Sequence, residues 1–508
     1  MTRTDLPSLN RPLISVSVMA ATIMQAIDST IANVALPKMQ GTLSATQDQM
    51  AWVLTSYIVA AAIMIPLTGW LAQRFGRKPV FLISVVGFTI TSALCGIATS
   101  LPEIVLFRLL QGISGAALVP LSQAVLFDIN PPERHGRAMA IWGVGVTMGP
   151  IIGPALGGWL TDQYSWRWVF FINVPIGILA YLGLTVFMPN THKIKHAFDF
   201  FGFVTLALGI GALQLLLDRG ELKDWFNASE IVLYGLVAGT AFYLFLMHTA
   251  SYRRPFLSPA LFKDRNFLAA TVFIFLIGVV LFATLALIPP MLQNEMNYPV
   301  VLTGLVTAPR GMGTLIAMLL VGRLVGRIDA RLIMAAGLGL TVLSLWQMTR
   351  FDLLMDQHPI IYTGVLQGFG IGLSYVPLST VAFSTLPSEL RNEGTAFFNL
   401  LRNIGSAIGI SIVQTLLTRN TQILHAELGT HLTAYSLASS TPASAVIDLV
   451  SPAALSRLNG EITRQAAMMA YNNDFYLMMV ITLAVIPLLI LLRPPRRKAP
   501  SEPITTLE

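Results

Sequence analysis

One carboxylate, Asp28, stands in the middle of a long apolar segment, within residues 26–37. It is the only carboxylate that we place deep within such a segment. An ionisable side chain in a membrane-length apolar segment is a functional hypothesis by default, because a charge in lipid is costly. A carboxylate that alternates between a dry environment and an ion pair can bind and release a proton. Arg108, in another apolar segment, is its plausible partner.

Two interpretations of this pair stay open. In one, proton binding at Asp28 drives a conformational change through Arg108. In the other, the two side chains form a permanent ion pair that only joins two helices. Arg310 and Arg402 also fall within apolar segments, where each can line a central cavity or satisfy backbone carbonyls at a helix break. The other candidates for the cavity are polar side chains in or near the apolar segments: Asn33, Tyr57, Gln111, Gln123, Gln367, Tyr375 and Asn399.

The sequence offers little for other chemistry. It has no phosphate-binding loop, no His/Cys cluster with metal-ligand spacing and no pair of intramembrane carboxylates, which argues against an enzyme. His192 and His196 lack a third ligand, so a solvated basic loop is the better interpretation of them. A sensor would need a soluble output domain, and the tail after Arg493 is too short for one. Cys95 is the only cysteine, so an intrachain disulfide is excluded. We expect no cofactor and no metal.

The elements that must position these side chains are apolar throughout. Of the 508 residues, 54% are hydrophobic and 11% are charged, and the mean hydropathy is +0.68. Soluble domains carry about 25% charged residues, so this chain has too little polar surface to face water all round. Its net charge of +7 lies between the apolar segments, which argues against a nucleic-acid partner. The first apolar segment lacks a cleavage site and is interpreted as a span, not as a signal peptide.

A helix needs about 20 residues to cross the hydrocarbon core, and on this measure we predict an all-α membrane protein with fourteen spans. Their predicted starts lie near Pro12, Met50, Pro79, Glu103, Arg137, Trp168, Phe200, Glu230, Phe267, Val300, Arg331, Pro359, Glu393 and Phe475. An even number of spans puts both termini on one side of the membrane. The loops on that side hold most of the Lys and Arg residues, so the positive-inside rule predicts cytoplasmic termini.

An internal repeat divides the chain, as in many transporter folds. Leu-Gln-Gly at 110–112 and Val-Pro-Leu-Ser at 119–122 recur at 366–368 and 376–379. Spans one to six therefore correspond to spans nine to fourteen, and spans seven and eight are an inserted pair. The predicted parts are an N-terminal half (1–190), the inserted pair (191–255), a C-terminal half (256–498) with a periplasmic segment (418–474), and a cytoplasmic tail (499–508).

The repeat is unequal at one position. Arg108 lies three residues before Gln111, whereas the residue three positions before Gln367 is Gly364. A buried cation is therefore expected in one half only. Because such repeats place the substrate between the halves, near the midplane of the membrane, the binding site is expected there.

The loop after span two, residues 69–80, resembles the loop motif of the major facilitator superfamily, Gly-x-Leu-Ala-Asp-Arg-x-Gly-Arg-Lys. The matching residues are Gly69, Arg74, Gly76 and Arg77. Gln73 replaces the usual Asp, which puts the interdomain charge relay of that family in doubt. The resemblance implies that Asp128, at the end of span four, pairs with Arg74 or Arg77. In the alternative interpretation the basic residues only fix the topology.

Span five resembles the antiporter motif of the same superfamily. Its matching residues are Gly145, Gly149, Gly153, Pro154, Gly157 and Gly158. Glycines at four-residue spacing form a groove in which another helix can pack closely, and Pro150 and Pro154 are expected to bend the span. Packing alone would explain the glycines, but the full pattern resembles exporters more than importers.

Five stretches are similar to the fourteen-span drug:proton antiporter family: those around Asp28 and Arg108, residues 308–313 around Arg310, residues 401–405 around Arg402, and residues 166–177. The Trp residues of the last stretch suit a membrane interface. The resemblance implies proton-coupled export of lipophilic or amphipathic compounds across the inner membrane by alternating access, driven by the proton gradient. Drugs, uncouplers, fatty acids, siderophores and other endogenous metabolites all stay open as cargo. A proton-coupled uptake permease is the alternative.

Residues 418–474 form a polar segment between spans thirteen and fourteen, with a helix-like run over 452–470. Its position and its end, residues 464–471, resemble the EmrB-type permeases of Gram-negative tripartite pumps. The resemblance implies three kinds of partner: small lipophilic substrates, a periplasmic HlyD-type adaptor and a TolC-type outer-membrane channel. In the alternative interpretation this segment is a tolerated insertion that covers the outer mouth of the protein.

Overall fold

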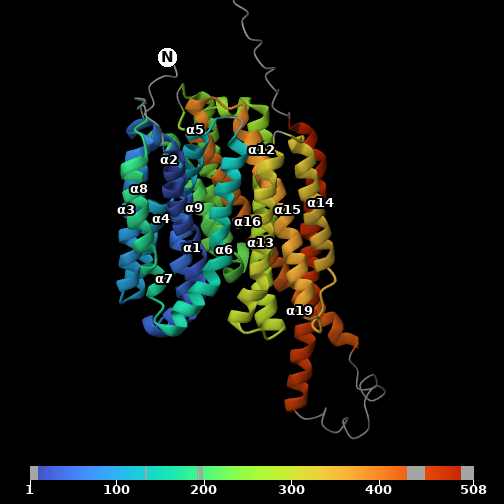
Figure 1. Ribbon diagram of the computed structural model, residues 1–508. Coiled ribbons are helices and arrows are strands. Elements are labelled where there is room, and N and C mark those ends of the chain that lie inside the picture. Colours follow the sequence, from blue (N-terminus) through green and yellow to red (C-terminus); the bar gives the residue numbers. More distant parts are fainter. Residues whose placement is uncertain are drawn as a thin grey trace, which may run out of the picture.

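The computed structural model describes residues 10–131, 134–191, 193, 198–253, 255–325, 327–431 and 452–492. Apart from an isolated bridge between Val325 and Ile328, the regular elements of these residues are helices. Thirteen helices are long and apolar enough to cross a membrane, and there are fourteen if the two bent parts of α6 are counted as one span. The prediction of an all-α membrane protein is confirmed (Figure 1).

Eight helices build the first six spans: α1 (Arg11–Leu43), α2 (Gln47–Phe75), α3 (Arg77–Ile97), α4 (Leu101–Gly115), α5 (Leu118–Ile129), α6 (His135–Gln163), α7 (Trp168–Phe171) and α8 (Asn173–Phe187). Span four consists of α4 and α5, and span six consists of α7 and α8. The two parts of α6 are inclined at 41° to each other at a break after Gly153. This is the region where the two prolines of span five predict a bend.

The predicted inserted pair consists of α9 (Phe200–Arg219) and α10 (Ser229–Ser251). The later helices are α11 (Ala260–Lys263), α12 (Arg265–Pro290), the π-helical turn η4 (Met291–Glu295), α13 (Val300–Leu324), α14 (Ala330–Met348), α15 (Gln357–Ser384), α16 (Arg391–His431), α19 (Pro452–Val485) and the 3-10 helix η7 (Ile486–Leu491). α1 begins and η7 ends at the same end of the bundle, as an even number of spans requires (Figure 1).

Thirteen of the fourteen predicted span starts lie within three residues of the start of a helix, the largest difference being Met50 against Gln47. The last prediction is wrong, because the span expected to start near Phe475 belongs to α19, which begins at Pro452. α16 likewise continues to His431. With 41 residues it is roughly 60 Å long, about twice the thickness of the hydrocarbon core.

The polar segment is therefore largely a continuation of two spans. Residues 418–431 of α16 and 452–464 of α19 project from the end of the bundle opposite the start of α1, and we call them the α16–α19 extension (Figure 1). Within it, the His425 ring nitrogen and Asn459 Oδ1 are 3.1 Å apart. The residues between the two helices, 432–451, lie outside the described part of the chain.

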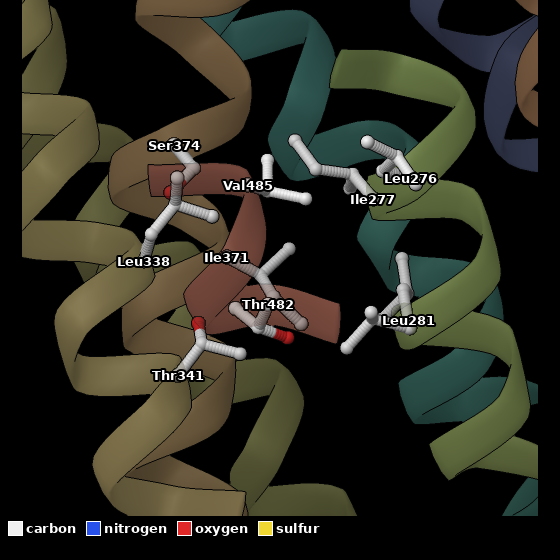
Figure 2. Close-up of a pocket in the computed structure, with 10 residues that line it drawn as sticks. Leu276, Ile277, Leu281, Leu338, Thr341, Ile371, Ser374, Thr482 and Val485 are labelled. Atoms are coloured by element: carbon white, nitrogen blue, oxygen red, sulfur yellow. The ribbon is translucent and has the colours of Figure 1, made fainter. Parts of the chain in front are cut away.

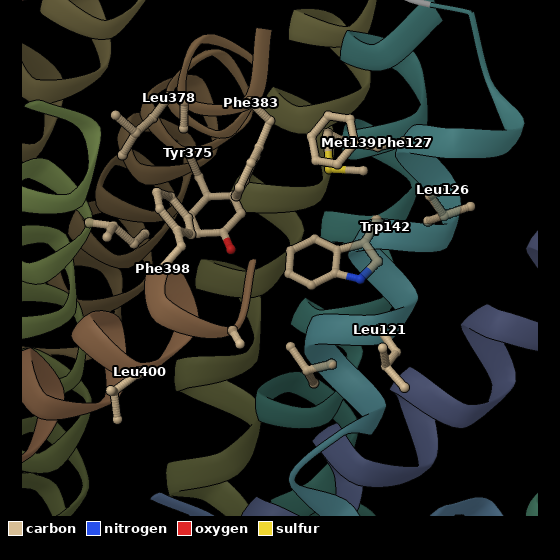
Figure 3. Close-up of a cluster of buried hydrophobic side chains, with 14 of the residues drawn as sticks. Leu121, Leu126, Phe127, Met139, Trp142, Tyr375, Leu378, Phe383, Phe398 and Leu400 are labelled. Carbon is tan, nitrogen blue, oxygen red and sulfur yellow. The ribbon is translucent and has the colours of Figure 1, made fainter. Parts of the chain in front are cut away.

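The two halves meet through a cluster of buried aromatic side chains (Figure 3). The ring centroids of Phe127 on α5 and Phe383 on α15 are 5.1 Å apart. Trp142 on α6 is stacked on Tyr375 of α15 at 6.0 Å and is fully buried. Large aromatic side chains dominate the energetics of such contacts, so this cluster holds the halves together in the conformation described here.

Helix α9 touches both halves. It packs against α10, α2 and α16. The hydroxyl of Thr55 on α2 donates a hydrogen bond to Asp218 on α9, and Ser411 Oγ on α16 donates to the carbonyl of Leu217 at 3.0 Å. The predicted inserted pair is thus a bridge from one half to the other on one side of the bundle.

Candidate functional site

Asp28 and Arg108 form an ion pair in the interior of the N-terminal half. Arg108 Nη1 lies 2.8 Å from Asp28 Oδ2, and the two side chains are 1% and 0% exposed. α1 supplies the acid and α4 the base, so the pair joins two helices that are separated along the chain by α2 and α3.

Neutral donors complete the shell of the carboxylate. Asp28 Oδ1 accepts a hydrogen bond from Gln111 Nε2 at 2.9 Å and another from Asn173 Nδ2 at 2.8 Å. Asn173 also donates to Ser92 Oγ at 3.0 Å. A buried ion pair needs such extra hydrogen bonds because the attraction of the two charges alone does not offset their loss of hydration.

The guanidinium is equally well bonded. Arg108 Nε donates to the carbonyl of Val53 at 3.1 Å, and Nη1 donates to Gln111 Oε1 at 2.8 Å. Its Cζ lies 4.2 Å from the centre of the Tyr57 ring, which places a cation over an aromatic face. Of the predicted cavity residues, Tyr57 and Gln111 therefore belong to this network, whereas Asn33 is exposed and lies outside it.

Sequence reasoning missed Asn173, Ser92 and Gln25. Asn173 lies in the stretch 166–177, which we interpreted as an interfacial one. That interpretation suits Trp168, which is 50% exposed, but it is wrong for Trp166 and Asn173, which are 3% and 0% exposed. An amide in an apolar segment was the available signal. Gln25 Nε2 donates to the hydroxyl of Tyr57 at 3.3 Å and extends the network along α1.

The C-terminal half carries a neutral version of this network. Asp28 and Thr284, Gln111 and Gln367, and Arg108 and Gly364 are each 256 residues apart. Gln367 Nε2 donates to Thr284 Oγ1 at 3.2 Å, as Gln111 donates to Asp28. The repeat thus keeps the amide between the equivalent helices and replaces the carboxylate by a hydroxyl.

The C-terminal half nevertheless has a buried cation, so the expectation of one in a single half holds only for the position of Arg108. Arg310 on α13 is 7% exposed. Its Nη2 lies 3.4 Å from the carbonyl of Leu281. Arg402 on α16 is half-buried, and its Nη1 lies 3.5 Å from the hydroxyl of Tyr375.

Gln123 and Asn399 form a polar link across the halves. Asn399 Nδ2 on α16 donates to Gln123 Oε1 on α5 at 3.1 Å, and both residues are buried. In this conformation these two predicted cavity residues are therefore bonded to each other across the halves.

The loop motif also joins the halves. Asp128 forms ion pairs with Arg77 and, through Oδ1 at 3.1 Å, with Arg391 of α16. Arg77 Nε also donates to Asn392 Oδ1 at 2.6 Å. Of the two predicted partners of Asp128, the structure selects Arg77 over Arg74 in the described part of the chain. Asp128 is thus shared between a cation of each half.

Gln73 stands close to this link. Its Nε2 donates to the backbone carbonyl of Glu389 at 3.2 Å, so an amide contact replaces the charge expected of an Asp. At Gly69 a Cβ would lie 3.0 Å from the Cα of Glu393, which explains why only glycine lets α2 approach α16 so closely. Gly76 has φ +92° and turns the chain between α2 and α3.

The glycines of α6 form the predicted groove, and α1 lies in it. A Cβ at Gly149 would overlap the carbonyl of Ala26, and one at Gly153 would overlap Thr30 Oγ1. Cβ atoms at Gly145 and Gly157 would meet Met19 and Ile31 of the same helix. Gly158 is different, because its Cβ would have 3.9 Å to the nearest atom. Pro154 follows Gly153 at the bend of the helix.

The groove also repeats in the C-terminal half. Gly405 and Gly409 on α16 lie 256 residues after Gly149 and Gly153. Cβ atoms there would clash with the backbone of Phe275, or lie 2.5 Å from the carbonyl of Val279, both on α12. Each half therefore packs its first helix against its fifth span through small residues.

A second carboxylate is buried, which corrects the expectation that Asp28 stands alone. Asp474 on α19 is 1% exposed, and neither of its oxygens has a hydrogen-bond partner among the described residues. The error has the same cause as the misplaced span start. Because α19 begins at Pro452 and not near Phe475, Asp474 lies inside the helix and not before it.

The one small cavity that we describe lies within the C-terminal half (Figure 2). It measures about 20 Å³ and is lined by α12, α14, α15 and α19, with apolar side chains such as Ile277, Leu281 and Ile371 beside Thr341 and Thr482. A volume of this size holds about one water molecule. It is therefore too small to be the predicted substrate site.

Comparison with known proteins agrees with this architecture. The family model of the Major Facilitator Superfamily matches residues 18–410. The fatty acid resistance protein FarB of Neisseria gonorrhoeae is 34% identical over 486 residues, which cover 95% of this chain and 96% of FarB. The multidrug export protein EmrB of Escherichia coli (strain K12) is 34% identical over 488 residues, 95% of each chain. The proton:xylose symporter XylE has a similar fold, with a TM-score of 0.59, 13% identity and coverage of 94% of this chain and 96% of XylE.

Proposed function

This chain belongs to the major facilitator superfamily of transporters, and from that premise we propose that it exports lipophilic or amphipathic compounds in exchange for protons. Relatives at 34% identity over almost their whole length are named for multidrug export and for fatty acid resistance. The observation that carries the proton coupling is the Asp28–Arg108 pair, which is fully buried and hydrogen-bonded to two further helices, α2 through Val53 and α8 through Asn173.

The pair is placed where a proton can alter the packing of helices. Protonation of Asp28 removes the negative charge that holds Arg108, and Gln111 and Asn173 lose their strongest acceptor. These residues join α1 to α4 and α8. α1 in turn lies in the groove of α6, and α6 packs against α13 of the other half. A change at Asp28 therefore acts on helices that contact both halves, as alternating access requires.

Asp28→Asn is expected to lower proton-driven transport by at least about tenfold, because the Asn amide does not ionise and so cannot bind and release a proton. Exchange of substrate between the two sides without a proton gradient should persist. The measurement is transport in proteoliposomes with and without a pH gradient, using a panel of lipophilic compounds. Ser29→Ala is the matched control, since this neighbouring hydroxyl is exposed and bonds only to the carbonyl of Ala26 on its own helix. Full proton-driven transport by Asp28→Asn would instead support a permanent ion pair.

We further propose that the chain lies in the inner membrane with both termini in the cytoplasm. The excess of Lys and Arg on the side of the termini supports this orientation. The α16–α19 extension then projects into the periplasm, where a HlyD-type adaptor and, beyond it, a TolC-type channel would complete a tripartite pump. Two exposed apolar side chains on the extension, Ile423 (62%) and Leu455 (53%), support a docking surface there.

A photo-crosslinking amino acid at Ile423 or Leu455 is expected to capture a co-expressed HlyD-type adaptor several-fold more efficiently than the same residue at Leu354. Leu354 is 94% exposed and lies in the loop between α14 and α15, at the same end of the bundle. It therefore controls for exposure alone. Equal capture at the three positions would count against docking on the extension. The transport proposal does not depend on docking, because export of lipophilic compounds can be measured in vesicles that contain no adaptor.

A further inference from the structure

Arg310 is a buried guanidinium without an acid. It is 7% exposed, and no carboxylate of the described chain lies within 4.0 Å of it. Its hydrogen bond to the carbonyl of Leu281 is long, at 3.4 Å. Arg108, which is 1% exposed in the other half, bonds to a carboxylate, an amide and a carbonyl. Because a buried charge is costly when unpaired, Arg310 needs an explanation that Arg108 does not.

A glycine of α15 lies against the base of the Arg310 side chain. Gly364, which stands where the repeat has Arg108, faces Arg310, and a Cβ there would lie 3.5 Å from the Cβ of Arg310. The C-terminal half thus has its cation on α13 instead of α15, and the residue of α15 that faces it is a glycine.

The neighbouring polar groups converge on one turn of α12. Arg310 reaches this turn from α13 at Leu281, and Gln367 reaches it from α15 at Thr284. Gln367 Oε1 is buried and has no partner among the described residues. In the N-terminal half, the corresponding turn carries Asp28. The C-terminal half therefore presents the donors of the ion-pair site, with a hydroxyl in the place of the anion.

We propose that Arg310 binds the anionic headgroup of the transported compound, a carboxylate or a similarly compact anion on an amphipathic molecule. This inference rests on the proposed export function and names the substrate class of the same transporter. A guanidinium offers a planar pair of donors to such an anion, and Thr284 supplies a neutral neighbour. Leu281, whose carbonyl Arg310 contacts, and Ile277 on the same helix line the mostly apolar cavity of Figure 2, and their apolar side chains suit the attached hydrocarbon.

The test compares two amphiphiles with equal tails and opposite charge, dodecanoate and dodecyltrimethylammonium. Binding is measured by calorimetry on the full chain in phosphatidylcholine nanodiscs. Arg310→Gln is expected to weaken dodecanoate binding at least about tenfold and to leave the cation unaffected or bound more tightly. Arg310→Lys, which keeps the charge but loses the planar fork, should fall between the wild type and Arg310→Gln. Equal dodecanoate affinity in Arg310→Gln and the wild type overturns the proposal.

Three controls make the result specific. Arg350→Gln removes an exposed arginine that lies over Trp346 at the protein surface, and it should leave dodecanoate binding unchanged. Thermal unfolding shows whether Arg310→Gln folds, and dodecanoate should raise the melting temperature of the wild type but not of this variant. In nanodiscs with phosphatidylglycerol, dodecanoate should still bind. Loss of that binding, with phosphatidylglycerol retained on the purified wild type but not on Arg310→Gln, identifies a lipid headgroup as the anion and overturns the proposal.

The outcome is distinguishable from a failure of the proposed function. If the wild type transports none of the panel with a pH gradient, proton-coupled export is wrong, whatever Arg310 binds. If the wild type transports dodecyltrimethylammonium and Arg310→Gln does so equally well, export stands, and the difference in dodecanoate binding alone decides the role of Arg310.

Discussion

Arg108→Gln is expected to destabilise the protein by about 3 to 5 kcal/mol, the range observed when one partner of a buried ion pair is removed. The remaining carboxylate of Asp28 would be 0% exposed and would keep only the two amides of Gln111 and Asn173 as donors. The double variant Asp28→Asn/Arg108→Gln should recover most of this loss, because it removes the second charge as well.

A double-mutant cycle measures this coupling, with the free energy of unfolding obtained from denaturant titration in detergent micelles. The matched control is Arg219→Gln. Arg219 Nε lies 3.5 Å from Glu230 Oε1 in a pair that is partly exposed, and such pairs contribute less than about 1 kcal/mol. Additive effects of the two single changes in the cycle would show that the pair is not an energetic unit.

Gly149→Ala is expected to lower the transport rate at least about tenfold and to cost about 1 to 3 kcal/mol of stability, as overpacking does in a well-packed core. The added Cβ would overlap the carbonyl of Ala26 and lie 2.8 Å from its Cβ. A backbone atom cannot turn aside as a side chain can, so α1 has to move. Ala26 lies two residues before Asp28, and the ion pair is displaced with it.

Gly158→Ala is the matched control for this prediction. It lies in the same helix and the same motif, but its Cβ would have 3.9 Å to Val34. Alanine in a helix interior is about 1 kcal/mol more favourable than glycine, so Gly158→Ala should be as stable as the wild type or more so. Initial rates in proteoliposomes and melting temperatures measure both effects. Similar losses at the two positions would mean that helix flexibility, and not close contact with α1, explains the motif.

The starts of the spans were predictable because the thickness of the bilayer limits the length of an apolar segment directly. That limit ends where the helix leaves the lipid. α19 continues outward to Pro452 through polar residues, and hydropathy gives no information about helix there. The burial of Asp474 was not predicted for the same reason, since this residue lies just outside the apolar run that hydropathy detects.

The site was predictable where a buried charge needs a partner of opposite charge. Asp28 and Arg108 are two such charges in apolar segments, and they pair with each other. Asn173 carries no such requirement, and its surroundings also fit an interface. The place of Arg310 depends on two helices, α13 and α15, lying side by side. Gly364 on α15 suggested that the C-terminal half has no buried cation, whereas Gly364 lies directly against one, Arg310. Asp128 and Arg391 are 263 residues apart, and nothing local announces their contact.

Helix α16 has a mechanical consequence. It runs without interruption from Arg391, which is paired with Asp128 at one end of the bundle, to His431 in the extension at the other. A rod roughly 60 Å long that tilts by one degree moves its tip by about 1 Å. If the contact at Asp128 opened and α16 tilted by several degrees, the tip would move by several ångströms. If the proposed adaptor binds this tip, the tilt of α16 would report to the adaptor which conformation the transporter has.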